Sequence, residues 1–109
     1  MKTLGVLALL IAAFPAAGFA GEIYGTITEQ GKPVKEGVKV TVTCGEKSVG
    51  GQTDKNGAYR VFADEEGKCT LVVKVGEEAP SVAIHSYADS ARYNLVLEKK
   101  DGKYTLRSE

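Results

Sequence analysis

The chain has 109 residues, enough for one domain, and it carries 14 basic and 14 acidic side chains. This balance argues against nucleic acid or an anionic membrane surface as a partner, since both recruit proteins with a clear excess of Lys and Arg. The charges are spread along the chain, as on an ordinary solvated surface.

The beginning of the chain has the composition of a secretory signal peptide. One positive charge, Lys2, precedes an uncharged apolar run over residues 4–14, and small residues follow it. This pattern predicts cleavage between Ala20 and Gly21. An uncleaved anchor or a buried first helix is the alternative interpretation.

The apolar run is shorter than the roughly 20 residues that cross a bilayer, so we expect no stable membrane span after cleavage. The chain then has two parts, a signal peptide over residues 1–20 and a mature domain over residues 21–109. This organisation predicts a secreted or periplasmic protein.

The mature part consists of short runs in which apolar and polar residues alternate. Gly, Pro, Asn and Asp separate these runs, and no helical period is present. The pattern predicts an all-β fold, a seven- to eight-stranded antiparallel Greek-key β-sandwich of the transthyretin-like or Ig-like kind. The expected strands cover residues 22–28, 38–44, 47–53, 58–62, 69–75, 81–87, 92–98 and 103–107.

The turn between the third and fourth of these strands contains Asp54, Asn56 and Gly57. Asp can hydrogen-bond to the backbone a few residues ahead, and Asn-Gly tolerates positive φ. An Asn-Gly pair between two extended runs is a strong hairpin signal. We therefore predict a β-hairpin with its tip at residues 54–57, and a second hairpin at Asp101-Gly102.

The two cysteines, Cys44 and Cys69, lie in register with the apolar positions of their strands. Both thiols should therefore point into the core, and export would place them where disulfides persist. We predict a buried Cys44–Cys69 disulfide that stabilises the domain by roughly 3–4 kcal/mol. A redox or metal-ligand role lacks both the Cys-x-x-Cys spacing and nearby partner ligands.

With the strands laid out, the mature chain resembles the carboxypeptidase regulatory-like domain, a transthyretin-like (prealbumin-like) sandwich. The resemblance covers roughly residues 21–97 and implies a non-catalytic accessory module. It rests on the sequences YGTIT, GKPV, GVKVTV, TDKNGAY and GKCTLVV, at residues 24–28, 31–34, 37–42, 53–59 and 67–73. The disulfide is not a general mark of that family.

The sequence contains no convincing catalytic, metal or cofactor site. His85 is the one histidine, and a zinc site would need several ligands beside it. Ser81, His85 and Asp89 could be drawn as a triad, but no nucleophile-elbow context supports it. The hydroxyisourate hydrolases of the transthyretin-like fold need several histidines and a different C-terminus. We expect no enzyme, no cofactor and no bound metal.

Two functions remain open at this stage. The first is an exported module for protein interaction or structural support in the cell envelope, meeting an unidentified protein partner or envelope component. Its expected contact points are two edge strands, one at Gly50-Gly51 and one at residues 103–107, because sheet edges offer unpaired backbone groups. The alternative is a carbohydrate- or surface-binding module that uses exposed tyrosines, Tyr24, Tyr87 and Tyr93.

Overall fold

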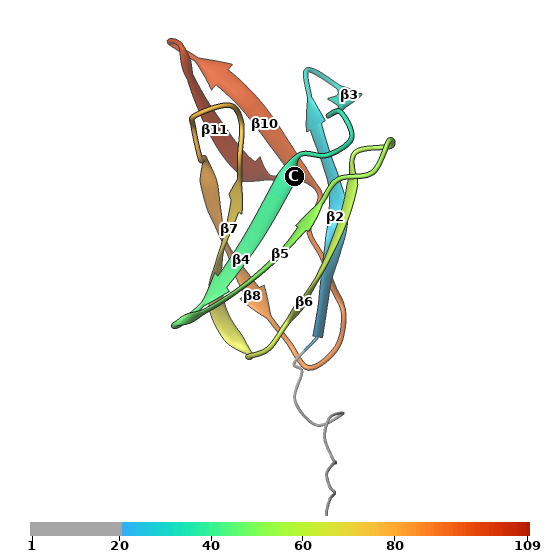
Figure 1. Cartoon of the computed structure of the whole chain (residues 1–109), viewed down its shortest axis with the longest axis vertical. Helices are drawn as coiled ribbons and strands as arrows, with labels where there is room; N and C mark the ends of the chain where they lie inside the picture. The colour runs from blue at the N-terminus through green and yellow to red at the C-terminus, as the bar shows by residue number, and fades with distance from the viewer. Residues whose placement is uncertain (1–20) are drawn as a thin grey trace, which may run out of the picture.

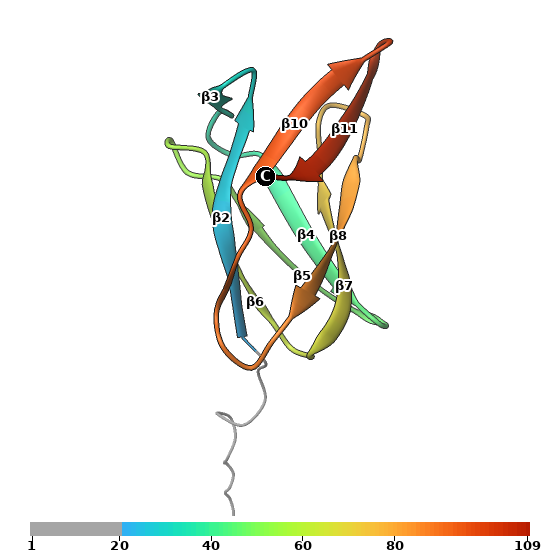
Figure 2. The ribbon, with the colours of Figure 1, turned by 180° about the vertical axis from the view of Figure 1, so that it is seen from behind.

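The computed structural model describes residues 21–109, which form two β-sheets packed face to face (Figure 1). Figure 2 shows the molecule from behind. β4 (Lys39–Cys44) and β5 (Lys47–Gln52) lie nearer the viewer in Figure 1, and β10 (Leu95–Lys100) and β11 (Lys103–Ser108) lie nearer in Figure 2. The predicted signal peptide, with its cleavage site after Ala20, lies outside the described residues. Within those residues, no helix has the length and hydropathy of a membrane span.

The larger sheet is built around β2 (Gly21–Glu29), whose two halves have different neighbours. The first half lies between β6 (Ala58–Ala63) and the short β9 (Ala91–Arg92). The second half lies between the short β3 (Lys32–Pro33) and β10 (Leu95–Lys100). The last strand of the chain, β11, pairs with the free side of β10 and covers Lys103–Ser108.

The smaller sheet has the order β5-β4-β7-β8. Its two central strands are β4 (Lys39–Cys44) and β7 (Gly67–Val73). Its edges are β5 (Lys47–Gln52) and β8 (Ser81–Ser86). The predicted edge strand at Gly50-Gly51 is therefore an edge, and β11 is an edge of the other sheet.

The core lies between the inner faces of the sheets and follows the alternation of the sequence. In the long strands other than β5 and β11, alternate side chains are buried against the opposite sheet, because successive residues of a strand point to opposite faces. β11 has one buried residue, Leu106. The largest fully buried side chains are Ile23, Ile27, Val40, Val42, Val61, Leu71, Val73 and Leu95.

The predicted all-β sandwich is confirmed. Of the ten strands in residues 21–109, eight have six or more residues, in agreement with the expected seven to eight. One feature differs from the expected antiparallel arrangement, since β2 runs parallel to both β9 and β10. After β8, the chain crosses from the smaller sheet to the larger one and places β9 and β10 alongside β2.

The hairpin predicted at Asp54, Asn56 and Gly57 is wrong, although these residues do form a tight turn. Before the turn, β5 pairs with β4; after it, β6 pairs with β2 in the other sheet. The two ends are held by different partners: the Thr53 N–H donates to the Val38 carbonyl oxygen (3.0 Å), and the Gly57 carbonyl oxygen accepts from the Ile27 N–H (2.9 Å). The turn therefore connects the two layers.

The second predicted hairpin, at Asp101-Gly102, is confirmed between β10 and β11. Asp101 has φ 54° and Gly102 has φ 82°. Positive φ at both central residues is typical of the type I′ turn, whose twist matches that of paired strands.

The disulfide between Cys44 and Cys69 is confirmed, and it joins the two central strands of the smaller sheet. The two Cα atoms are 4.4 Å apart, which is the spacing of directly opposite residues in a pair without backbone hydrogen bonds. Both cysteines are buried. The bond therefore links the C-terminal end of β4 to the N-terminal part of β7 from inside the core.

Candidate functional site

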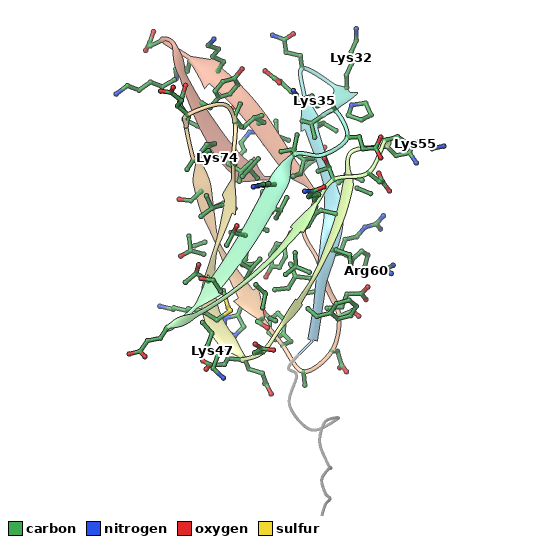
Figure 3. All side chains as sticks on the ribbon, viewed as in Figure 1. Lys32, Lys35, Lys47, Lys55, Arg60 and Lys74 are labelled. Carbon is green, nitrogen blue, oxygen red and sulfur yellow. A yellow bond between two sulfur atoms is a disulfide. The ribbon has the colours of Figure 1, made fainter. Side chains whose placement is uncertain are left out.

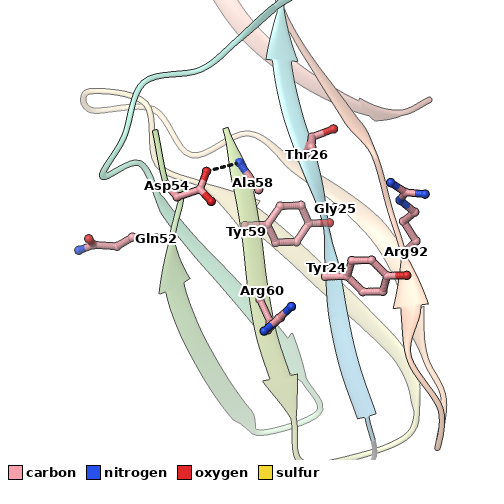
Figure 4. A pocket seen from close by; sticks show the side chains of 9 residues that line it. All are labelled: Tyr24, Gly25, Thr26, Gln52, Asp54, Ala58, Tyr59, Arg60 and Arg92. Carbon is pink, nitrogen blue, oxygen red and sulfur yellow. Dashed lines mark hydrogen bonds between the residues drawn. The ribbon is translucent and has the colours of Figure 1, made fainter. Parts of the chain in front are cut away.

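A hollow of about 460 Å³ lies on the outer face of the larger sheet (Figure 4). We call it the side hollow. It is concave, and its volume falls in the range of small-ligand sites. Its lining comes from β2, β6, β9, the end of β5 and the turn after it: Tyr24, Gly25, Thr26, Gln52, Asp54, Ala58, Tyr59, Arg60 and Arg92.

Tyr24 and Arg92 form one wall of the side hollow (Figure 4). Both point outward from neighbouring parallel strands, where they are paired in register. The guanidinium carbon of Arg92 lies 5.9 Å from the centre of the Tyr24 ring, within the range of a cation–π contact. In residues 21–109, Arg92 has no salt bridge to a carboxylate. Its N–H donors are therefore available to a ligand beside the ring.

Arg60 lies opposite Tyr24 on β6 and closes the lower side of the hollow. Its side chain forms a salt bridge with Glu22. The second oxygen of that carboxylate accepts a hydrogen bond from the Ser90 hydroxyl at 2.8 Å. These contacts orient Arg60, so the two arginines differ: one is held by a carboxylate, and the other lies against an aromatic ring.

Asp54 contributes a carboxylate at the upper side of the hollow. Its Oδ1 atom accepts hydrogen bonds from the backbone N–H groups of Ala58 (3.0 Å) and Asn56 (2.8 Å). These bonds lower the pKa of the Asp54 carboxyl, with the Ala58 N–H as the larger cause, so the group is ionised at neutral pH. The second oxygen, Oδ2, takes part in neither bond. Asp54 thus shapes the turn and presents a charged acceptor.

The floor of the side hollow is held by contacts between β2, β6 and the segment that joins β9 to β10. The buried Tyr59 hydroxyl donates a hydrogen bond to the Tyr93 carbonyl oxygen at 2.7 Å. Gly25, opposite Tyr59 on β2, leaves room for that carbonyl group: an added Cβ would lie 2.0 Å from the Tyr93 oxygen. The Asn94 side chain accepts from the Thr26 N–H at 3.2 Å.

The three tyrosines predicted to bind sugar have separate positions. Tyr24 lines the side hollow. Tyr87 is exposed, and its ring centre lies 4.6 Å from that of His85. The Tyr93 hydroxyl accepts from the His85 N–H (2.9 Å) and donates to the His85 carbonyl oxygen (3.0 Å). Tyr93 therefore holds edge strand β8. Of the three tyrosines predicted to bind sugar, Tyr24 alone lines the side hollow.

The triad drawn from Ser81, His85 and Asp89 is incompatible with the fold. Ser81 and His85 lie on the same strand, β8. Four residues along a strand span roughly 13 Å, so the serine and histidine side chains cannot meet. Among residues 21–109, no group of three or more His, Cys, Asp or Glu side chains could hold a metal ion.

Sequence reasoning identified Tyr24 but missed Arg60 and Arg92. Each arginine lies on an outward position of its strand, where a charged residue is ordinary. What makes them a site is their register against Tyr24, and that register joins segments 36 and 68 residues away in the chain. No local pattern carries this information.

Comparison with known proteins gives a likeness of fold. No protein-family model matches the chain, and no curated protein matches it by sequence. A solved structure from Bacteroides uniformis, provisionally named a carbohydrate binding protein, aligns with a TM-score of 0.58 and 15% identity, over 84% of this chain and 54% of its own. One from Bacteroides fragilis, provisionally named a cell adhesion protein, aligns with a TM-score of 0.44 and 10% identity, over 99% and 49%.

The first of these structures supports the β-sandwich fold. This chain spans about half the length of either structure. Because no family model matches, the resemblance to the carboxypeptidase regulatory-like domain stays a prediction.

Proposed function

We propose that this chain is an exported, non-catalytic binding module of the cell envelope, with a carboxypeptidase regulatory-like fold, and that its side hollow binds carbohydrate. The observation that carries the proposal is the outward Tyr24 ring with Arg92 and Arg60 in register beside it and Asp54 across the hollow (Figure 4). An aromatic ring can stack on the C–H face of a sugar, because tyrosine combines an apolar body with a polar tip. A guanidinium group can donate two parallel hydrogen bonds to neighbouring oxygen atoms, and Oδ2 of Asp54 can accept one from a hydroxyl group.

The surroundings of the hollow also favour the binding of a ligand. The polar groups are oriented by fixed contacts, and a preorganised site loses less entropy when a ligand binds. The solved structure from Bacteroides uniformis is provisionally named for carbohydrate binding, which agrees with the proposal. Export and cleavage after Ala20 belong to the same proposal and are supported by the composition of residues 1–20.

The proposal is tested by probing a glycan array with the labelled mature domain, residues 21–109, and two variants. We expect retention on a defined set of glycans, and a loss of about tenfold or more for Tyr24→Ala, since a stacked aromatic side chain in a binding site often contributes more than 1 kcal/mol. Tyr87→Ala is the matched control, because it removes an exposed tyrosine that lies outside the hollow. Retention that Tyr87→Ala abolishes and Tyr24→Ala leaves intact would refute the assignment.

A protein partner at the edge strand β5 is the second candidate. Among residues 21–109, β5 pairs with β4 only, and a shallow hollow beside it is lined in part by Gly50 and Gly51. An exposed strand edge can accept an extended peptide from another protein. However, Gly51 also packs closely on β6, since an added Cβ would lie 3.0 Å from the Arg60 carbonyl oxygen. This close approach restricts access to that edge and makes carbohydrate binding the better-supported function.

A further inference from the structure

A second hollow, of about 540 Å³, lies at the end of the sandwich where the two sheets separate. We call it the end hollow. It shares no lining residue with the side hollow. Its lining comes from four strands of the larger sheet, β2, β3, β10 and β11, and from the loops after β2, β3 and β7: Glu29, Gln30, Pro33, Val34, Lys35, Val38, Lys74, Val75, Gly76, Leu97 and Tyr104.

The floor of the end hollow is apolar and continuous with the core. Val34 and Leu97 belong to the core, while Val38, Val75 and Tyr104 are partly buried and pack against it. Partly buried apolar side chains around a concavity leave apolar surface in contact with water, and covering that surface with a ligand is favourable. The floor would therefore accept an apolar chain.

The loops around the hollow are fixed by backbone contacts. Val75 and Glu78 exchange two hydrogen bonds of 2.9 Å, and the Lys74 N–H donates to the Lys39 carbonyl oxygen at 3.0 Å. On the other side, the buried Thr53 hydroxyl donates to the Lys35 carbonyl oxygen at 2.7 Å. The hollow is thus formed before any ligand binds, as small-molecule sites usually are.

The rim of the hollow carries a net positive charge. Lys35 and Lys74 lie near the same end of the molecule, whereas Lys47 lies at the opposite end (Figure 3). In residues 21–109 neither rim lysine has a salt bridge to a carboxylate. Glu29 is the one acidic residue of the lining. An anionic group would therefore be attracted to this rim.

We propose that the end hollow binds a small amphipathic carboxylate, an unbranched acyl chain whose carboxylate lies beside Lys35 and Lys74. The acyl chain would cover the apolar floor of the end hollow, and the carboxylate would face the ammonium groups of the two lysines. Burying one methylene contributes about 0.8 kcal/mol, so affinity should rise about fourfold for each added methylene until the floor is covered. The site is independent of carbohydrate binding at the side hollow.

NMR titration of the mature domain with hexanoate, octanoate and decanoate tests this proposal. We expect amide shifts at Val38, Val75 and Leu97, with an affinity that rises along the series. Decanol should bind more weakly than decanoate, by up to about fivefold, which is the range of an exposed ion pair. Shifts confined to other parts of the domain, or no shifts at all, would overturn the proposal.

A variant that lacks both lysine charges of the rim provides a second test of the proposal. Replacing both rim lysines, as Lys35→Gln with Lys74→Gln, should abolish the preference for decanoate over decanol and leave decanol binding unchanged. Lys47→Gln is the matched control at the other end of the molecule and should keep the preference. If the double variant keeps the preference as well, the assignment of the carboxylate position is wrong.

Discussion

At Gly25, the backbone of the segment between β9 and β10 occupies the place where a side chain would lie. An added Cβ would be 2.0 Å from the Tyr93 carbonyl oxygen. We expect Gly25→Ala to displace the segment between β9 and β10 and to lower the free energy of unfolding by about 1–3 kcal/mol, the usual cost of overpacking. Urea unfolding measures this loss. Gly50→Ala is the control, because its Cβ would meet its nearest atom at 3.4 Å; equal losses in both variants would contradict the explanation.

Tyr59 makes the fold sensitive to alkali. Burial, and to a smaller extent the neighbouring Tyr93, raises the pKa of the Tyr59 hydroxyl above its ordinary value of 10.0. The folded state therefore holds this proton more tightly than the unfolded chain does. Its stabilising contribution is complete below about pH 10 and is lost as the pH rises from there towards the folded-state pKa.

The variant Tyr59→Phe tests this linkage. At neutral pH it should lose about 0.5–1.5 kcal/mol, because its hydrogen bond to the Tyr93 carbonyl oxygen is absent. Above about pH 10, the stability of the wild type should fall more steeply than that of the variant, by up to about 1.4 kcal/mol per pH unit. Urea unfolding from about pH 8 to about pH 11 measures both slopes, and parallel slopes would count against a buried phenol at this position.

Among the strands, edge strand β8 is protected by a side chain from the connector that follows it. The Tyr93 hydroxyl bonds both the N–H and the carbonyl oxygen of His85. We expect Tyr93→Phe to lower stability by about 0.5–1.5 kcal/mol for each bond lost and to speed hydrogen exchange of the His85 amide. Tyr87→Phe is the control, since Tyr87 is exposed. An unchanged exchange rate at His85 in Tyr93→Phe would show that this cap is not needed.

The two turns with hairpin signals show which features of the strands a sequence can predict. Asp101-Gly102 and Asn56-Gly57 have similar local chemistry, and both form tight turns. Only the first joins strands that pair with each other. Pairing after the second is decided by distant groups, notably the Ile27 N–H and the Val38 carbonyl oxygen. The faces of the strands were predictable because the pleat is local, whereas strand partners depend on the whole fold.

For the molecule as a whole, the same distinction applies to the candidate sites. The disulfide was predictable because Cys44 and Cys69 share the alternation of their own strands and no other cysteine competes. Of the side hollow, the sequence predicted Tyr24 alone. Arg60 and Arg92 lie beside it because β6 and β9 pair with β2 in that register, and this pairing cannot be inferred from the local sequence. The end hollow depends on where the two sheets separate, which the sequence does not indicate locally.

Neither proposed site has a cysteine of the disulfide in its lining. The side hollow occupies an outer face, and the end hollow lies between the loops at one end. Tyr24 and Arg92 point outward and lie outside the core. Variants at these two positions should therefore fold normally, so a loss of binding can be interpreted directly.

The most direct test of carbohydrate binding at the side hollow is an NMR titration of the mature domain with the glycan that the array retains most strongly. Amide shifts should cluster at Tyr24, Thr26, Arg60 and Arg92, and Tyr24→Ala should remove them. Shifts centred on β5 or at Tyr87, with none around Tyr24, would contradict the account.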